Sequence, residues 1–186
     1  WQVGRLPEPL TVDELMEVLR DGEIVEASDN ASGPRMLKVQ SGDIVVDASF
    51  IPAPRTRGFS PELAAYRLDR FLQLGMVPAT VAREVDGTGG VLQFVPAETV
   101  NEAERRAGAN GNIAPCPLPE QWNSMYLFDV LIHNTGRTQD RMLYDTATWQ
   151  LMLTGHDVAF QTSRSRPAYL KELPITIGDY WQERLL

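Results

Sequence analysis

The spacing of apolar residues near the start of the chain predicts a short helix. Thr11 precedes the helical pattern and Glu14 follows three residues later, which is the arrangement of a capping box. Apolar residues then recur with helical spacing up to Gly22, a residue that favours the end of a helix. The predicted buried face consists of Leu15, Val18 and Leu19.

After this helix, apolar runs separated by turn-forming residues predict an antiparallel sheet. A second helix begins at Ser60, a good N-cap that Pro61 follows in the first turn, and Gly75 is expected to close it. The expected buried face of this helix consists of Leu63, Tyr66, Leu68, Phe71 and Leu72. The predicted strands, two of which form a hairpin after this helix, cover residues 22–27, 35–40, 43–51, 76–84 and 89–97.

The second half of the chain begins with a change of composition. Residues 101–121 are polar and rich in Gly, Ala and Pro, which is typical of a connection between two lobes. A third helix is expected next, followed by a polar loop, a strand pair and a tail with one or two short helices. Helical spacing in this third helix relates Trp122, Met125, Tyr126, Val130 and His133. The expected segments are the helix at 119–134, the strands at 141–145 and 148–160, and the tail at 167–186.

Composition narrows the classes of function. The 186 residues suffice for one domain, and no apolar run approaches the roughly 18 residues of a membrane helix. A net charge of −8 argues against nonspecific binding to nucleic acid or to anionic membranes. Cys116 is the single cysteine, so no intrachain disulfide is possible, and the two histidines, His133 and His156, are too few for a zinc site. No basic, apolar leader is visible, although the chain begins at Trp1, so an export signal removed upstream stays an alternative.

The order of these elements and three phrases of the sequence resemble the atypical kinase group. The phrases are PELAAYRLDRFLQLGMVPATV at 61–81, YLFDVLIHNTGRTQDRMLY at 126–144 and WQLMLTGHDVAF at 149–160. The group contains secretory-pathway protein kinases, phosphatidylinositol 3- and 4-kinases, and bacterial relatives. The resemblance implies an α+β, two-lobed, protein-kinase-like fold in minimal or truncated form. A single kinase-like domain, 1–186, would then consist of a small antiparallel-sheet lobe (1–100), a connection (101–121) and a mostly helical large lobe (122–186).

Positions that carry phosphoryl transfer in this family are changed in this sequence. Glu62 matches the glutamate that orients the family's nucleotide-binding lysine, but Ala48 stands where that lysine is expected, and Lys38 on the preceding strand is the nearest substitute. An exposed strand lysine is the simpler interpretation of Lys38.

In the loop, the family pattern is Asn-x-Asp-Arg-x-x-x-Asn. Asn134 and Arg137 match it, whereas Gly136 replaces the catalytic aspartate and Arg141 replaces the metal-binding asparagine. Gly155 replaces the metal-binding aspartate of the following segment. Glycine accepts no proton and arginine repels Mg²⁺, so we expect no metal site and predict that Gly136→Asp alone does not restore phosphoryl transfer.

These departures predict a pseudokinase with a binding or regulatory role rather than an enzyme. One alternative is an active phosphotransferase or nucleotidyltransferase that uses Asp140 and Asp157, and another is a soluble interaction module unrelated to kinases. The expected occupant of the inter-lobe cleft is a protein or a small anionic ligand. No cofactor is predicted with certainty, and ATP that binds without a strong Mg²⁺ requirement stays an alternative. Arg137 and Arg141 would hold such an anion, unless Arg137 instead pairs with Asp129 or Asp145. The compartment stays open between a bacterial cytoplasm and export. Residues expected to contact the ligand are Lys38, Glu62, Gln93, Asn134, Arg137 and Arg141.

Overall fold

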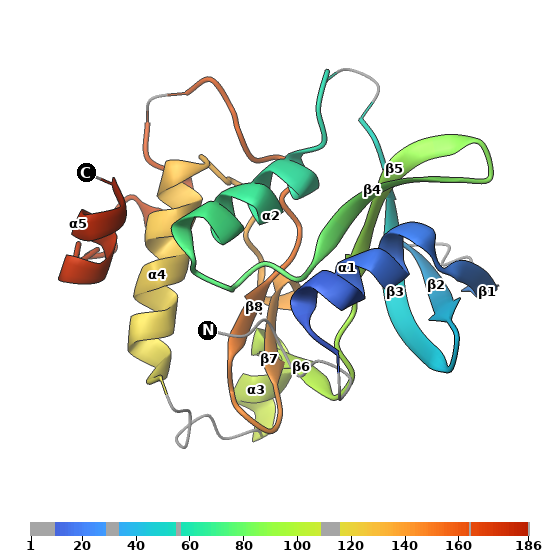
Figure 1. Cartoon of the computed structure of the whole chain (residues 1–186). Coiled ribbons are helices and arrows are strands. Elements are labelled where there is room, and N and C mark those ends of the chain that lie inside the picture. Colours follow the sequence, from blue (N-terminus) through green and yellow to red (C-terminus); the bar gives the residue numbers. More distant parts are fainter. Residues whose placement is uncertain (1–9, 29–33, 55–56, 109–115, 164, 186) are drawn as a thin grey trace.

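The fold is α+β and contains two antiparallel sheets (Figure 1). The computed structural model describes residues 10–28, 34–54, 57–108, 116–163 and 165–185. The larger sheet has five strands in the order β1-β2-β3-β5-β4. Its strands are β1 (Glu23–Ser28), β2 (Arg35–Ser41), β3 (Ile44–Pro52), β4 (Thr80–Val85) and β5 (Thr88–Phe94). All five predicted strands are therefore present, although β4 begins later than expected because residues 76–79 form part of the connection that precedes it.

Local signals in the sequence account for the ends of the first two helices. In α1 (Val12–Asp21), Thr11 and Glu14 form the predicted capping box. In α2 (Pro61–Leu72), the Ser60 hydroxyl accepts the backbone N–H of Leu63. Helix α2 ends before Gly75, because Gln73 takes the left-handed conformation, with a φ of 57°.

The hairpin between β4 and β5 turns at Asp86 and Gly87. Both residues have positive φ, 49° and 75°, which is the backbone that a two-residue type I′ turn requires. An Asp-Gly pair adopts this conformation at low cost, and the two-residue turn places Val85 opposite Thr88, so the hairpin is tighter than the predicted strands at 76–84 and 89–97.

Helix α1 packs on the large sheet and α2 contacts β4, and a continuous core lies between them. The expected face of α1 is buried, as are Tyr66 and Leu72 of α2. Two expected core positions are wrong: Phe71 is 78% exposed and Val130 is 36% exposed. Both lie on helices in which apolar residues occupy more than one face, so helical spacing alone did not indicate which residues face the core.

The smaller sheet joins strands from both sides of the expected inter-lobe connection. Its order is β6-β7-β8, with β6 (Thr99–Asn101), β7 (Met142–Asp145) and β8 (Leu151–Leu153). Part of the stretch 101–121 is helical, since α3 (Glu102–Gly108) follows β6 and α4 (Leu118–Leu131) begins near its end. The expected strand at 148–160 is limited to β8. The tail contains the 3₁₀ helix η2 (Ala168–Leu170) and α5 (Asp179–Leu185), as predicted.

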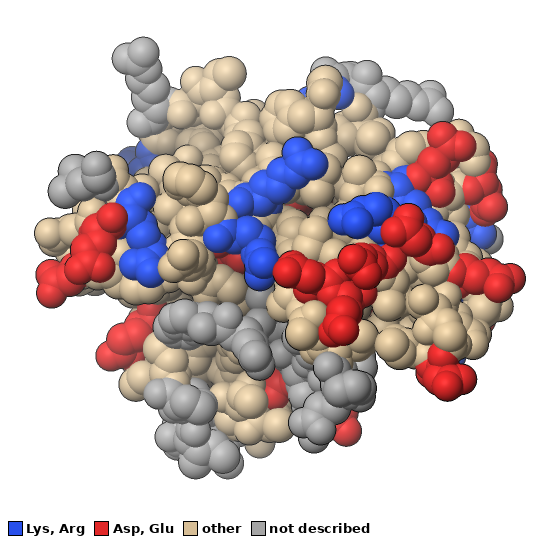
Figure 2. Space-filling view, in the orientation of Figure 1, with Lys and Arg blue, Asp and Glu red and all other residues tan. Residues whose placement is uncertain are grey.

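Acidic and basic side chains alternate on the surface seen in Figure 2. Acidic groups gather over α1 and basic groups lie beside them over α2. The two helices are joined there by a weak ion pair between Arg70 and Asp13, with 3.7 Å between nitrogen and oxygen. On this face the basic groups are therefore interrupted by acidic ones and form no continuous positive surface. Of the helices in the described ranges, none has the length and apolar character needed to cross a membrane.

Candidate functional site

Segments that are far apart in sequence meet at the buried side chain of His156. Glu62, in the first turn of α2, accepts the backbone N–H of His156 at 2.5 Å and lies 2.8 Å from its Nδ1. Burial acts to raise the pKa of Glu62, but the hydrogen bonds and charge of His156 outweigh it, so the pKa lies below its ordinary value. An ionised carboxylate only accepts hydrogen bonds, so Nδ1 of His156 is the donor to Glu62.

The guanidinium of Arg137 lies on the other side of this ring. Its Nη2 is 3.3 Å from Nε2 of His156, and it makes a two-point ion pair with Asp129 through bonds of 2.8 Å each. Its Nη1 donates to the backbone carbonyls of Arg141 and Thr154. The side chain is only 2% exposed, and that of Asp129 is fully buried. Arg137 therefore uses its donors inside the protein, as the alternative of pairing with Asp129 predicted.

The loop around Gly136 is held in place by the same carboxylate. The Asn134 amide donates to Asp129, and its own carbonyl oxygen accepts the backbone N–H of Gly136 at 3.1 Å. The Tyr169 hydroxyl also donates to Asp129. Burial and the adjacent Asp129 charge raise the pKa of Tyr169 well above its ordinary value. This network connects α2, α4, the polar loop and the segment at 154–156 through groups that all have partners.

The side chain of Arg141 fills the space beside Gly136 and Gly155, the two glycines at positions where the resemblance implies aspartates. A Cβ on Gly155 would lie 2.3 Å from Cδ of Arg141 and 2.6 Å from its Nε. A Cβ on Gly136 would lie 3.2 Å from Nη1 of Arg141 and 2.5 Å from Cγ2 of Val158. Gly155 also has a φ of +70°, which disfavours any residue with a side chain. The two glycines and the arginine thus form one packed unit.

Arg141 is also tied down by hydrogen bonds. Its Nη1 donates to the carbonyls of Gly136 and Gly155 at 3.3 Å each, and to a carboxylate oxygen of Asp157 at 2.6 Å. The arginine side chain stays 31% exposed and that of Asp157 55% exposed. The guanidinium of Arg141 is therefore held by three acceptors, and one side of it is open to solvent.

Two further residues expected at the site, Lys38 and Gln93, make their contacts elsewhere. Lys38 lies on β2, where it pairs with Glu26 at 3.0 Å. Its neighbour Leu37 is opposite Ala48, and adjacent residues of a strand face opposite sides, so Lys38 faces away from the position of the family's lysine. Gln93 is buried on β5 and donates to the Thr80 hydroxyl.

The two aspartates of the alternative enzyme hypothesis are in different settings. Asp157 is paired with Arg141, whereas the exposed Asp140 has a pKa below its ordinary value, mainly because the Thr138 side chain donates to it. Within the described residues, no group of three or more His, Cys, Asp or Glu side chains has the arrangement of a metal site.

Sequence reasoning missed the contribution of Tyr169, which reaches Asp129 from the tail. No motif marks this residue, because a single tyrosine in the short helix η2 has no local pattern. It also missed that Arg141 would occupy both glycine positions, although the three simultaneous changes at Gly136, Arg141 and Gly155 were visible as a set.

Comparisons with known proteins add little to this geometry. No protein-family profile matches the chain, and no curated protein matches it significantly. Twenty-six solved chains have a similar structure. One of them, described as WaaP in complex with acyl carrier protein, is 16% identical, with a TM-score of 0.40, and the match covers 97% of this chain and 85% of that chain. A likeness this distant transfers no activity or partner to this protein.

Proposed function

We propose that the chain is a catalytically degenerate kinase-like domain that acts by binding or regulation. Arg141 is the observation that carries the proposal. Its side chain lies beside Gly136 and Gly155, the two positions at which the resemblance implies carboxylates, and its charge is proposed to take the place of a metal ion. A site of this kind has neither a proton acceptor at position 136 nor an anionic cage for Mg²⁺.

The class of ligand follows from the charges around Arg141. Arg137 is buried and fully paired, so it does not supply a free cation. Arg141 is partly exposed and has one exposed carboxylate as its ion partner. An anion such as a phosphate group is proposed to bind Arg141 in competition with Asp157, without a metal ion. ATP is the nucleotide with which to test this, because its phosphates would meet a guanidinium in place of Mg²⁺.

Two substitutions separate this proposal from simple surface binding. Asp157→Asn removes the competing charge and keeps the side-chain shape. The affinity for ATP, measured by calorimetry in EDTA, is therefore expected to rise by up to about fivefold, which corresponds to the roughly 1 kcal/mol of an exposed ion pair. Arg141→Gln is expected to reduce affinity by a similar or larger factor. Asp140→Asn is the matched control, because this carboxylate is also exposed but accepts its hydrogen bonds from the Thr138 side chain and from its own backbone. Equal affinities for all four proteins would reject Arg141 as the anion site.

The alternative of an active phosphotransferase makes the opposite prediction. It requires Asp157 to be free to bind a metal, so ATP turnover would depend on Mg²⁺ and would fall in the Asp157→Asn variant. The alternative of a module unrelated to kinases is disfavoured by the contact between α2 and the five-stranded sheet, which the kinase-like arrangement requires.

A further inference from the structure

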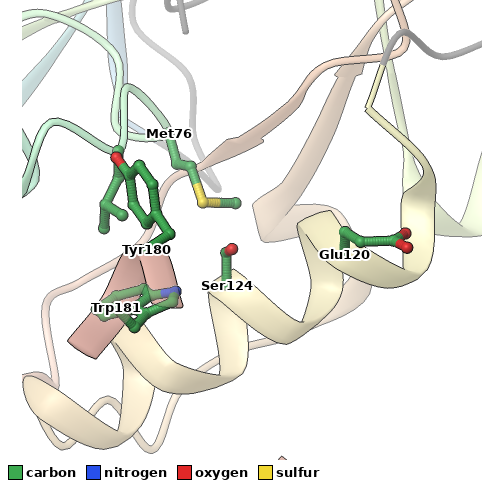
Figure 3. A pocket seen from close by; sticks show the side chains of 6 residues that line it. Met76, Glu120, Ser124, Tyr180 and Trp181 are labelled. Atoms are coloured by element: carbon green, nitrogen blue, oxygen red, sulfur yellow. The ribbon is translucent and has the colours of Figure 1, made fainter. Parts of the chain in front are cut away.

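A cavity lies between α4 and α5, next to the segment that joins α2 to β4 (Figure 3). Its volume is about 230 Å³. Apolar and aromatic groups form most of its walls, and one hydroxyl and one carboxylate are added from α4. The lining residues are Leu74, Met76, Glu120, Ser124, Tyr180 and Trp181.

Hydrogen bonds to backbone groups hold the walls of this cavity apart. The buried carboxylate of Asp69 accepts the backbone N–H of Met76 at 2.8 Å, which fixes the segment between α2 and β4. From α5, the Tyr180 hydroxyl donates to the carbonyl of Gln73 at 2.7 Å, and Arg184 stacks on the Tyr180 ring with 3.6 Å to its centroid. The cavity is therefore formed before any ligand arrives, since its walls are fixed by contacts outside it.

One polar group in the wall has no partner. Trp181 is 3% exposed, and its Nε1 makes no hydrogen bond to any described residue. In Figure 3 the nitrogen edge of its ring is turned toward Ser124, across the cavity. Trp122, on the same helix as Ser124, shows the usual situation, because its Nε1 donates to the Tyr144 hydroxyl at 2.8 Å. A buried donor without an acceptor is unfavourable, and tryptophan normally finds one.

We propose that this cavity binds a small, uncharged, mainly apolar molecule whose acceptor oxygen receives the Trp181 indole N–H. A dry apolar cavity of about 150 Å³ admits benzene, so a volume of about 230 Å³ accommodates a single ring with a short substituent. Glu120 at the edge of the cavity disfavours a carboxylate ligand by charge repulsion. The site shares no residue with the Arg141 site, so it does not depend on the function proposed above.

The test compares two probes of similar shape. Acetophenone carries an acceptor oxygen on an apolar ring, and ethylbenzene lacks the oxygen. Titrations of the full chain with ¹⁵N-labelled tryptophan are expected to shift the indole signal of Trp181, with acetophenone binding about tenfold tighter than ethylbenzene. Absence of saturable acetophenone binding up to its solubility, or equal affinity for the two probes, would overturn the proposal.

Variants assign the preference to the indole N–H. Trp181→Phe keeps a ring but removes the donor, so the two probes should bind equally, whereas Trp122→Phe should preserve the tenfold preference. Because Trp181→Phe could fail to fold, Ser124→Met provides a second test: it fills the cavity from α4 and should abolish binding of both probes. A preference that survives Trp181→Phe, or acetophenone binding unchanged in Ser124→Met, contradicts the proposal. A crystal structure with acetophenone in which a water molecule, and not the ketone oxygen, accepts the Trp181 indole N–H would also contradict the proposal.

Discussion

Replacement of Arg137 by methionine is expected to be among the most destabilising single changes in the protein. The methionine keeps an extended apolar side chain but removes the charge that faces Asp129. Asp129 is fully buried and would retain only the Asn134 amide and the Tyr169 hydroxyl as donors. The Thr154 carbonyl would also lose the Arg137 donor, and the Arg141 carbonyl would keep only the backbone N–H of Thr154. Removing one partner of a buried ion pair costs about 3–5 kcal/mol, a large part of the roughly 5–15 kcal/mol that stabilises a typical domain.

Urea unfolding followed by tryptophan fluorescence measures this loss. The double variant Arg137→Met with Asp129→Asn removes the uncompensated charge, so it is expected to recover part of the stability. Lys38→Gln is the control, because the Lys38–Glu26 pair is exposed and should contribute less than about 1 kcal/mol. The reasoning is refuted if Arg137→Met lies within about 1 kcal/mol of the wild type, since Asp129 would then not need its partner.

Two further predictions concern Gly136 and Asp69. Gly136→Asp should not produce ATP turnover, and it should lower the free energy of unfolding by about 1–3 kcal/mol because its Cβ meets Val158 at 2.5 Å. Gly89→Ala is the neutral comparison, because no described atom lies within 4 Å of the new Cβ. ATP turnover in Gly136→Asp would contradict the prediction. Burial raises the pKa of Asp69 from 3.8 to about 7 against the opposing backbone hydrogen bonds of Met76 and Val77. Because the pKa of Asp69 is higher in the folded chain than in the unfolded chain, protonated Asp69 stabilises the folded state at acid pH. This stabilisation is lost as the pH rises from about 4 to about 7, by up to about 4 kcal/mol. The unfolding free energy of the wild type relative to Asp69→Asn should therefore fall over this interval, and a constant difference would show that Asp69 does not retain its proton.

Local chemistry made the two helix starts in the first half of the fold predictable from the sequence. Thr11 and Ser60 each satisfy the backbone within a few residues, so their effects do not depend on distant parts of the chain. The exposed Phe71 and the pairing of β6 with β7 depend instead on which segments meet in space. No short window of sequence contains that information.

The same distinction applies to the candidate site. The changes at Gly136, Arg141 and Gly155 could be read one position at a time against a family pattern. The sequence does not show that Arg141 fills the space beside both glycines, because the three residues are separated by up to 19 positions and meet only after folding. Lys38 illustrates the opposite case: its strand was predicted, but the register of β2 against β3 directs its side chain to the other face.

The metal dependence of ATP binding tests the central claim most directly. Calorimetric titration of the wild-type protein with ATP, once in EDTA and once in excess Mg²⁺, compares the two situations on the same site. With Arg141 in place of the metal, ATP should bind in EDTA, and Mg²⁺ should leave the affinity unchanged or weaken it by shielding the phosphates. Binding that requires Mg²⁺, accompanied by release or transfer of the terminal phosphate, would contradict a metal-free, catalytically degenerate site.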